Sequence, residues 1–126
     1  MLLEKDFELK GEMKKDSVIQ EKSFQFSLKI IALYKILVSQ KEFIISKQLL
    51  RSATSIGANV EEATAASSKK DFAYKMSISS REARESKYWL RLLNESDLVE
   101  VDLKEYLNDV EELIRILTAI VKSSQG

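Results

Sequence analysis

Apolar residues recur every three or four positions along most of this 126-residue chain, and no proline interrupts them. Spacing of this kind places the apolar side chains on one face of an α-helix. Proline would break such a helix, and glycine, which weakens helices, occurs only three times. The pattern therefore predicts an all-α protein.

The spacing predicts four helices, which cover residues 23–39, 42–66, 69–94 and 102–122. The first has a wide apolar face that consists of Phe24, Leu28, Ile31 and Val38, flanked by Phe26, Ile30, Leu33 and Leu37. The others each have one stripe: Leu49, Ala53, Ile56, Val60 and Ala63; Phe72, Met76, Ala83, Leu90 and Leu93; Leu103, Leu107, Val110, Ile114, Leu117 and Val121. Each stripe needs a partner in order to leave water, so an antiparallel up-down-up-down four-helix bundle is the economical packing.

Two short polar patterns mark helix starts. Ser68 stands three residues before Asp71, and Asp102 stands three residues before Glu105. In both patterns the first side chain can cap the backbone N–H groups of a new helix, while the carboxylate favours the positive end of the helix dipole. We therefore expect the third and fourth helices to begin at these positions.

The chain has the length of one domain, and its two ends differ from its middle. Residues 1–16 are rich in charge without stable periodicity, which indicates a flexible N-terminal tail. Residues 17–123 are expected to form the bundle domain and residues 124–126 a C-terminal tail. The N-terminal segment lacks the apolar run of a secretory signal or membrane span, so we expect a cytoplasmic location and no membrane partner.

Several kinds of chemistry lack their usual residues. The chain has neither cysteine nor histidine, so disulfides, zinc-thiolate sites and the commonest general base are excluded. The neighbouring acids Glu61 and Glu62 lack the histidines of a di-iron bundle. We therefore expect no enzyme activity, no cofactor and no metal. The 20 basic residues equal the 20 acidic ones, so nothing draws the whole molecule to a polyanion.

The second helix carries a narrow polar stripe beside its apolar one. Ser52, Ser55, Asn59 and Glu62 follow one another at steps of three, four and three, next to Arg51. The stripe could line a binding groove, or its small polar side chains could allow close helix approach and bond across a helix or subunit interface. We favour the interface.

The third helix carries arginines at helical spacing beside aromatic residues. Arg81, Arg84, Tyr88 and Arg91 share one face, with Lys87 adjoining them. Cations can bind phosphates and rings can stack on bases, so this face is a candidate nucleic-acid surface. Residues 94–126, however, contain eight acidic and three basic side chains. We therefore favour electrostatic pairing of the basic face with the acidic stripe of the fourth helix: Asp102, Glu105, Asp109 and Glu112.

The segments QLLRSATSIGANVEEATAASSKKDF (residues 48–72) and SREARESKYWLRLL (residues 80–93) resemble the four-helix-bundle family first named for 23S rRNA intervening sequences. The strongest likeness is the run Arg51, Ser52, Ser55, Ile56 and Asn59, followed by Glu62. The resemblance spans roughly residues 23–122. It implies a four-helix bundle that associates as a pentamer.

A related branch of this family contains accessory proteins of diversity-generating retroelements, which bind nucleic acid and a reverse transcriptase. Those proteins are strongly basic, whereas this chain is neutral, so the ordinary intervening-sequence type fits better. We accordingly expect a homo-oligomeric scaffold or adaptor whose first partner is itself. The alternative is an RNA- or DNA-binding accessory factor with a protein partner.

Overall fold

Four helices make up the part of the chain that this computed structural model describes, namely the backbone of residues 4–125 and the side chains of residues 18–125. The helices are α1 (Glu4–Ser39), α2 (Ile45–Thr64), α3 (Lys69–Glu95) and α4 (Lys104–Gln125). No strand occurs within the described range, so the predicted all-α class is confirmed. The last three helices begin and end within three residues of the predicted bounds.

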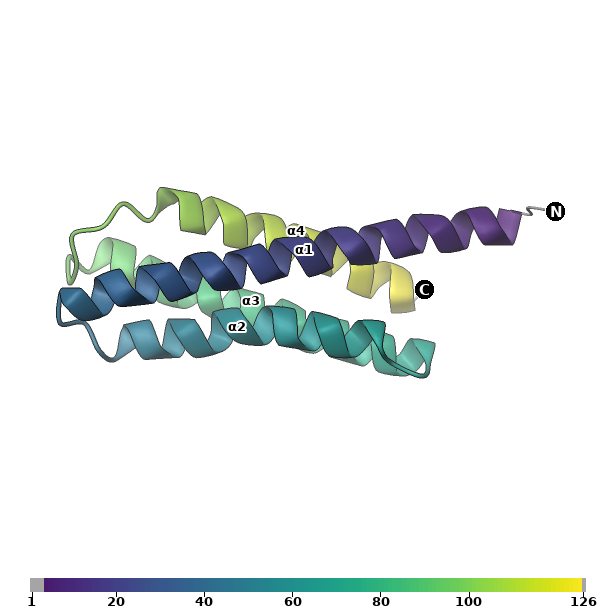
Figure 1. Cartoon of the computed structure of the whole chain (residues 1–126), viewed down its shortest axis with the longest axis horizontal. Helices are drawn as coiled ribbons and strands as arrows, with labels where there is room; N and C mark the ends of the chain where they lie inside the picture. Colours follow the sequence, from purple (N-terminus) through teal and green to yellow (C-terminus); the bar gives the residue numbers. More distant parts are fainter. Residues whose placement is uncertain (1–3, 126) are drawn as a thin grey trace.

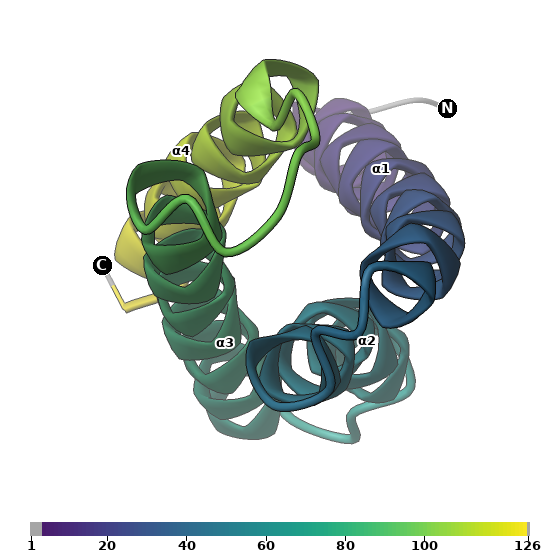
Figure 2. The same cartoon turned by 90° about the vertical axis from the view of Figure 1, so that its left-hand side faces the viewer.

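The helices pack as a bundle around one core (Figure 1). Each helix contacts two neighbours, in the cycle α1–α2–α3–α4 and back to α1, so α1 and α3 lie on one diagonal (Figure 2). The α1–α2 and α3–α4 connections lie at one end of the bundle, and the α2–α3 connection lies at the other (Figure 1). The outer faces of α1 and α3 therefore point away from each other, on opposite sides of the molecule.

The structure differs from the prediction at both ends of the chain. α1 begins at Glu4, so helical backbone covers most of the segment that the sequence assigns to a flexible tail. No proline stands between this segment and residue 23 to stop the helix. α4 continues to Gln125, past the predicted end at residue 122. Flexibility of residues 1–16 stays a prediction; residues 1–3 and 126 lie outside the described range.

The core consists of residues that repeat at steps of three and four along each helix. The stripe predicted for α2 is fully buried. In α3 all predicted core residues except Phe72, which is half-buried, are buried. In α4 three of the six predicted residues are buried, namely Leu103, Val110 and Leu117, together with Leu113 and Ile120. The other three, Leu107, Ile114 and Val121, are half-buried, so the helical spacing predicted the core of α2 and α3 better than that of α4.

The core face of α1 consists of the residues that the sequence analysis placed beside the main apolar face and not within it. Phe26, Ile30, Leu33 and Leu37 are at most 2% exposed, and Ile19 lies in line with them. The central predicted residues Phe24, Leu28 and Ile31 are instead 57%, 46% and 40% exposed, and Val38 is half-buried. Both sets fit the helical period. α2 and α4 pack on the flanking set, which leaves the other set in solvent.

Small residues bring α1 and α3 close to α2. The carbonyl of Ile56 accepts a hydrogen bond from Ser79 Oγ of α3 at 2.8 Å, and both residues are fully buried. On the other side, Gly57 faces Ser23 of α1: a Cβ built on Gly57 would lie 3.5 Å from the Ser23 carbonyl oxygen and 3.5 Å from its Oγ. These distances leave room for one methyl group and little more.

We therefore expect Gly57→Ala to raise the free energy of unfolding by about 0.5–1 kcal/mol, because alanine favours the helix and restricts the unfolded chain. Urea denaturation followed by circular dichroism measures the change. Gly57→Val is the matched control: its two extra methyl groups would press on Ser23, so it should destabilise the bundle. A loss of stability in the alanine variant would show that α1 and α2 pack more tightly than described.

Candidate interaction surfaces

The polar stripe of α2 divides between the bundle interior and its surface. Ser52 is fully buried, and its Oγ lies 2.8 Å from Ser86 Oγ of α3. Ser55 and Asn59 are half-buried and bond within α2: Ser55 Oγ donates to the Arg51 carbonyl, and Asn59 Nδ2 donates to the Ser55 carbonyl, each at 2.8 Å. The buried part of the stripe is thus a helix–helix contact.

Charged side chains at both ends of the stripe connect α2 to α3. Arg51 forms ion pairs with Glu82, at 3.4 Å, and with Glu85. Glu62 pairs with Lys75 at 3.1 Å. Arg51 therefore pairs with acids of α3. These pairs are largely exposed, so each contributes at most about 1 kcal/mol.

The acidic stripe of α4 faces α1 and not α3. Lys22 pairs with Glu112 at 3.1 Å, and Lys29 pairs with both Glu105 and Asp109. The predicted contact between this stripe and the arginines of α3 is therefore wrong within one subunit. The reason is positional: these acids lie on the side of α4 that meets α1, and Asp102 precedes the helix, where it accepts a hydrogen bond from the Lys104 N–H.

Lys29 is the centre of the α1–α4 contact. Partial burial opposes its charge, but hydrogen bonds and attraction from Asp109 and Glu105 outweigh this effect and raise the pKa of Lys29 above its ordinary value. Its Nζ also lies 5.7 Å from the centre of the Tyr106 ring, within cation–π range. The ammonium group is therefore charged at neutral pH and helps to dock α1 on α4.

The basic face of α3 remains on the outside of the bundle. We define the α3 Arg–Tyr stripe as Arg81, Arg84, Tyr88, Arg91 and Glu95. Arg81 has no hydrogen bond or ion pair within the described residues, and Arg84 donates to Thr118 of α4 at 3.2 Å. Among the described residues, Arg91 pairs only along its own helix, with Glu95 at 3.2 Å. Tyr88 is 55% exposed. The stripe is therefore open to a partner.

Residues beside this stripe hold it in place. Lys87 pairs with Glu111 of α4 at 3.3 Å. Trp89 is half-buried against the core, and its Nε1 donates to Glu85 at 2.9 Å. The rings of Trp89 and Tyr88 meet edge to face with their centroids 5.1 Å apart. Trp89 thus fills space in the bundle, whereas Tyr88 projects outward.

A second exposed surface lies along α1. We define the α1 outer stripe as Glu21, Phe24, Leu28, Ile31 and Lys35, all of which are exposed. These residues lie on the side of the helix opposite the core set, as their positions between Ser23, Phe26, Ile30 and Leu33 require. Contiguous apolar side chains on a helix exterior typically mark an interaction site. The three apolar residues of the stripe, Phe24, Leu28 and Ile31, were identified from the sequence but assigned to the core.

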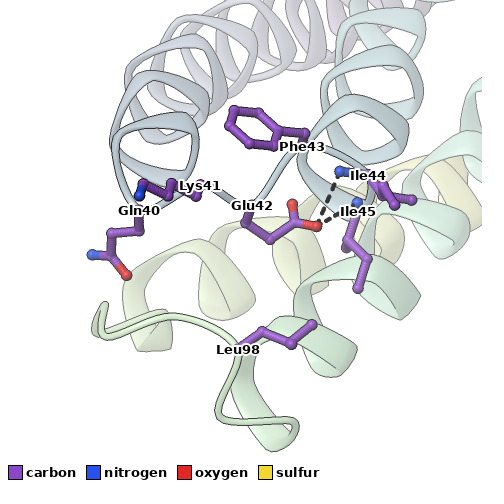
Figure 3. A pocket seen from close by; sticks show the side chains of 7 residues that line it. All are labelled: Gln40, Lys41, Glu42, Phe43, Ile44, Ile45 and Leu98. Carbon is purple, nitrogen blue, oxygen red and sulfur yellow. Dashed lines mark hydrogen bonds between the residues drawn. The ribbon is translucent and has the colours of Figure 1, made fainter.

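The connection between α1 and α2 forms a shallow hollow with exposed apolar walls (Figure 3). Phe43 is 58%, Ile44 77% and Leu98 57% exposed. Gln40 fixes this end of the bundle, because its side-chain amide donates to the Glu100 carbonyl at 3.1 Å and accepts from the Glu100 N–H at 2.7 Å. This hollow could not be predicted from the sequence, since its walls come from two connections far apart in the chain.

Glu42 is the polar centre of the same connection. Its carboxylate accepts hydrogen bonds from the backbone N–H groups of Ile44, Ile45 and Ser46, at 3.1, 2.8 and 2.6 Å, and two of these are drawn in Figure 3. Glu42 thus caps α2, which explains why this helix begins three residues after the predicted start. Burial opposes ionisation, but the three backbone N–H groups prevail and lower the pKa of Glu42.

Removing this cap should destabilise the bundle in a pH-dependent way. We expect Glu42→Gln to cost about 0.5–2 kcal/mol at pH 7, because glutamine offers one neutral oxygen to three N–H groups. Since the folded-state pKa is lowered, the stabilisation is present above the ordinary value near 4.5 and is lost as the pH falls through the folded-state pKa. Urea titrations measure the free energy of unfolding of wild type and variant. The difference between the two proteins should be smaller at pH 3 than at pH 7.

The control for this cap is Glu100→Gln, which removes an exposed carboxylate at the same end of the bundle. Among the described residues, Glu100 bonds through its backbone and not through its side chain. Its replacement should leave stability nearly unchanged at both pH values. An equal loss in the two variants would assign the effect to net charge and not to capping.

Neither a metal-binding cluster nor a membrane-spanning helix occurs in the described part of the chain. It contains no group of three or more acidic, histidine or cysteine side chains placed to hold a metal ion. None of the helices, over the residues described, is long and apolar enough to cross a membrane. The surfaces described above are therefore the candidate functional sites.

Comparison with known proteins gives a family match over most of the chain. Residues 15–119 match the model of the 23S rRNA-intervening sequence protein. None of the curated proteins matches the sequence. A solved structure of a protein of unknown function from the S23 ribosomal protein family of Bacteroides thetaiotaomicron is 45% identical, with a TM-score of 0.82. The match covers 86% of this chain and 98% of the other.

Proposed function

Since the chain belongs to the 23S rRNA-intervening sequence protein family, we propose that it is a non-enzymatic, cytoplasmic homo-oligomer that acts as a scaffold or adaptor. The observation that carries this proposal is the α1 outer stripe, where Phe24, Leu28 and Ile31 are 57%, 46% and 40% exposed. A lone subunit would leave this apolar surface in water, and a second copy would cover it. The resemblance described above favours a pentamer.

The proposal includes the antiparallel up-down-up-down arrangement of the helices. Its support is that successive connections lie at alternate ends of the bundle (Figure 1). In this arrangement α1 and α3 run in the same direction on opposite sides of the molecule. Each subunit then offers two different outer faces, one apolar and one basic, on which another copy or a partner can pack.

The mass in solution tests the proposed self-association. Light scattering over a dilution series should show a species several times the 14.4 kDa of one chain, with five copies as the expected number. The measured mass should fall on dilution as the assembly dissociates. A single 14.4 kDa species at the highest concentration would refute the proposal.

A second candidate function is RNA or DNA binding by the α3 Arg–Tyr stripe, as in an accessory factor of a reverse transcriptase. One observation favours it: the acids of α4 are engaged with Lys22 and Lys29 of α1, so they do not neutralise the arginines of α3. Arg81 and Tyr88 thus offer a cation for phosphate and a ring for stacking. The net charge of zero weighs against it.

Fluorescence anisotropy with a single-stranded RNA tests this second candidate. Binding through phosphates should weaken steeply between about 50 and 200 mM salt, because bound cations release counterions. The variant Arg84→Glu, Arg91→Glu should then lose binding, while Arg115→Glu, an exposed change on α4, should keep it. If wild type binds no RNA even at low salt, the candidate is excluded.

A further inference from the structure

The α1 outer stripe has opposite charges at its two ends. Glu21 stands at the N-terminal end and Lys35 at the C-terminal end, with three apolar residues between them. Neither charge forms an ion pair within the described residues; Glu21 only accepts a hydrogen bond from Gln25. The steps along the stripe are three, four, three and four residues. Glu21 and Lys35 are 14 residues apart, which is about 21 Å along a helix.

The α3 Arg–Tyr stripe has the same steps and the reverse charges. Arg81 stands at its N-terminal end and Glu95 at its C-terminal end, again 14 residues apart. Between them lie Arg84, Tyr88 and Arg91, of which Tyr88 is 55% exposed. Two helix faces with equal steps can pack side by side over several turns, because their side chains stay in register.

The two stripes complement each other in only one direction. When the helices run in parallel, Glu21 meets Arg81 and Lys35 meets Glu95. When they run antiparallel, Glu21 meets Glu95 and Lys35 meets Arg81, so like charges repel at both ends. Charge alone therefore selects the parallel packing and fixes its register.

The centre of the parallel arrangement is apolar on one side and amphipathic on the other. Leu28 lies opposite Tyr88, whose ring can cover it. Phe24 lies opposite Arg84, and Ile31 lies opposite Arg91. The aliphatic stems of both arginines can pack on these side chains while their guanidinium groups stay in water, and Arg84 can also stack on the Phe24 ring. The apolar side chains thus leave water without burial of an unpaired charge.

We propose that the α1 outer stripe of one copy packs in parallel on the α3 Arg–Tyr stripe of a second copy. The inference rests on the proposed self-association and names the two surfaces that meet. Within one subunit α1 and α3 lie on a diagonal and do not contact each other, so both stripes are available on every copy. The contact is therefore heterologous: the α1 outer stripe of each copy packs on the α3 Arg–Tyr stripe of the next copy. The rotation between copies then decides whether the assembly closes.

Charge exchange tests the register. Glu21→Arg should raise the apparent dissociation constant of the assembly about tenfold, because attraction to Arg81 becomes repulsion. Arg81→Glu should have an effect of similar size. The double variant Glu21→Arg, Arg81→Glu should recover most of the loss. The matched control pairs Glu21→Arg with Arg115→Glu on the exposed face of α4 and should recover nothing. Dilution series by light scattering measure the constants, and circular dichroism checks the fold.

The outcomes separate this inference from the proposed function. If the wild type is monomeric throughout, self-association fails and the inference with it. If the wild type assembles but no single reversal weakens it, or the double variant is not rescued, the α1–α3 register is wrong while self-association stands. If Arg81→Glu removes salt-sensitive RNA binding and leaves assembly intact, the stripe serves nucleic acid and the inference is overturned. The inference is supported if Arg81→Glu restores the assembly of the Glu21→Arg variant and Arg115→Glu does not.

Discussion

Phe26→Ala is expected to lower the free energy of unfolding by about 3–5 kcal/mol, a large share of the 5–15 kcal/mol that stabilises a typical domain. The Phe26 side chain is 2% exposed and belongs to the α1 core face. Its removal forfeits the transfer of the ring out of water and leaves a cavity that the rigid helices cannot fully close. Urea denaturation of the wild type and variant at equal concentration measures the difference.

Phe24→Ala is the matched control, because it makes the same chemical change two residues away on the exposed side of the same helix. Phe24 is 57% exposed, so the stability of the isolated subunit should change by less than about 1 kcal/mol. Measurements at concentrations where the subunits are dissociated keep assembly out of the comparison. Equal losses in the two variants would mean that α1 is rotated relative to the described structure.

Ile31→Lys is expected to abolish assembly without unfolding the subunit. Ile31 lies at the centre of the α1 outer stripe and is 40% exposed in the single chain. In an assembly that packs this stripe on the α3 Arg–Tyr stripe, the new ammonium group would replace an apolar contact and lie beside Arg91 of the second copy, which carries the same charge. The apparent dissociation constant should rise at least about 100-fold, which corresponds to roughly 2.7 kcal/mol. Light scattering should then report a 14.4 kDa species.

Ile36→Lys provides the comparison, because Ile36 is the same residue type on the same helix with a similar exposure of 42%. It points to a different side of α1, outside the stripe. Both variants carry the same added charge and the same change in helix propensity. Assembly should therefore persist in the Ile36 variant. Loss of assembly in both variants, or in neither, would contradict the assignment of the stripe as the interface.

The sequence by itself determined the helices, because their causes are local. The absence of proline and the spacing of apolar residues specify where a helix can form, and a serine three residues before Asp71 specifies where one begins. The Ser68 cap is confirmed: its Oγ accepts a hydrogen bond from the Asp71 N–H at 3.0 Å. The α2 core stripe could also be predicted from the sequence, since that helix has a single apolar face.

The connection before α2 could not be predicted from the sequence, because two features there override the helical periodicity. Lys41 adopts a left-handed conformation with a φ of 66°, and the Glu42 N–H donates to the Leu37 carbonyl, which ends α1. The Glu42 side chain then turns toward α2 and caps it. A glutamate is an ordinary helix former in sequence terms, so nothing in the local pattern distinguished this one.

The orientation of α1 and the partners of the charged stripes were decided only by the tertiary structure. Phe24 and Phe26 belong to two apolar sets that fit one helical period equally well, and the packing of α2 and α4 selected the second for the core. Likewise, the acids of α4 could attract any nearby cation, and the bundle brought Lys29 to Asp109 while it left Arg81 outside. Periodicity fixes which residues share a face of a helix; only the neighbouring helices fix which face is inside.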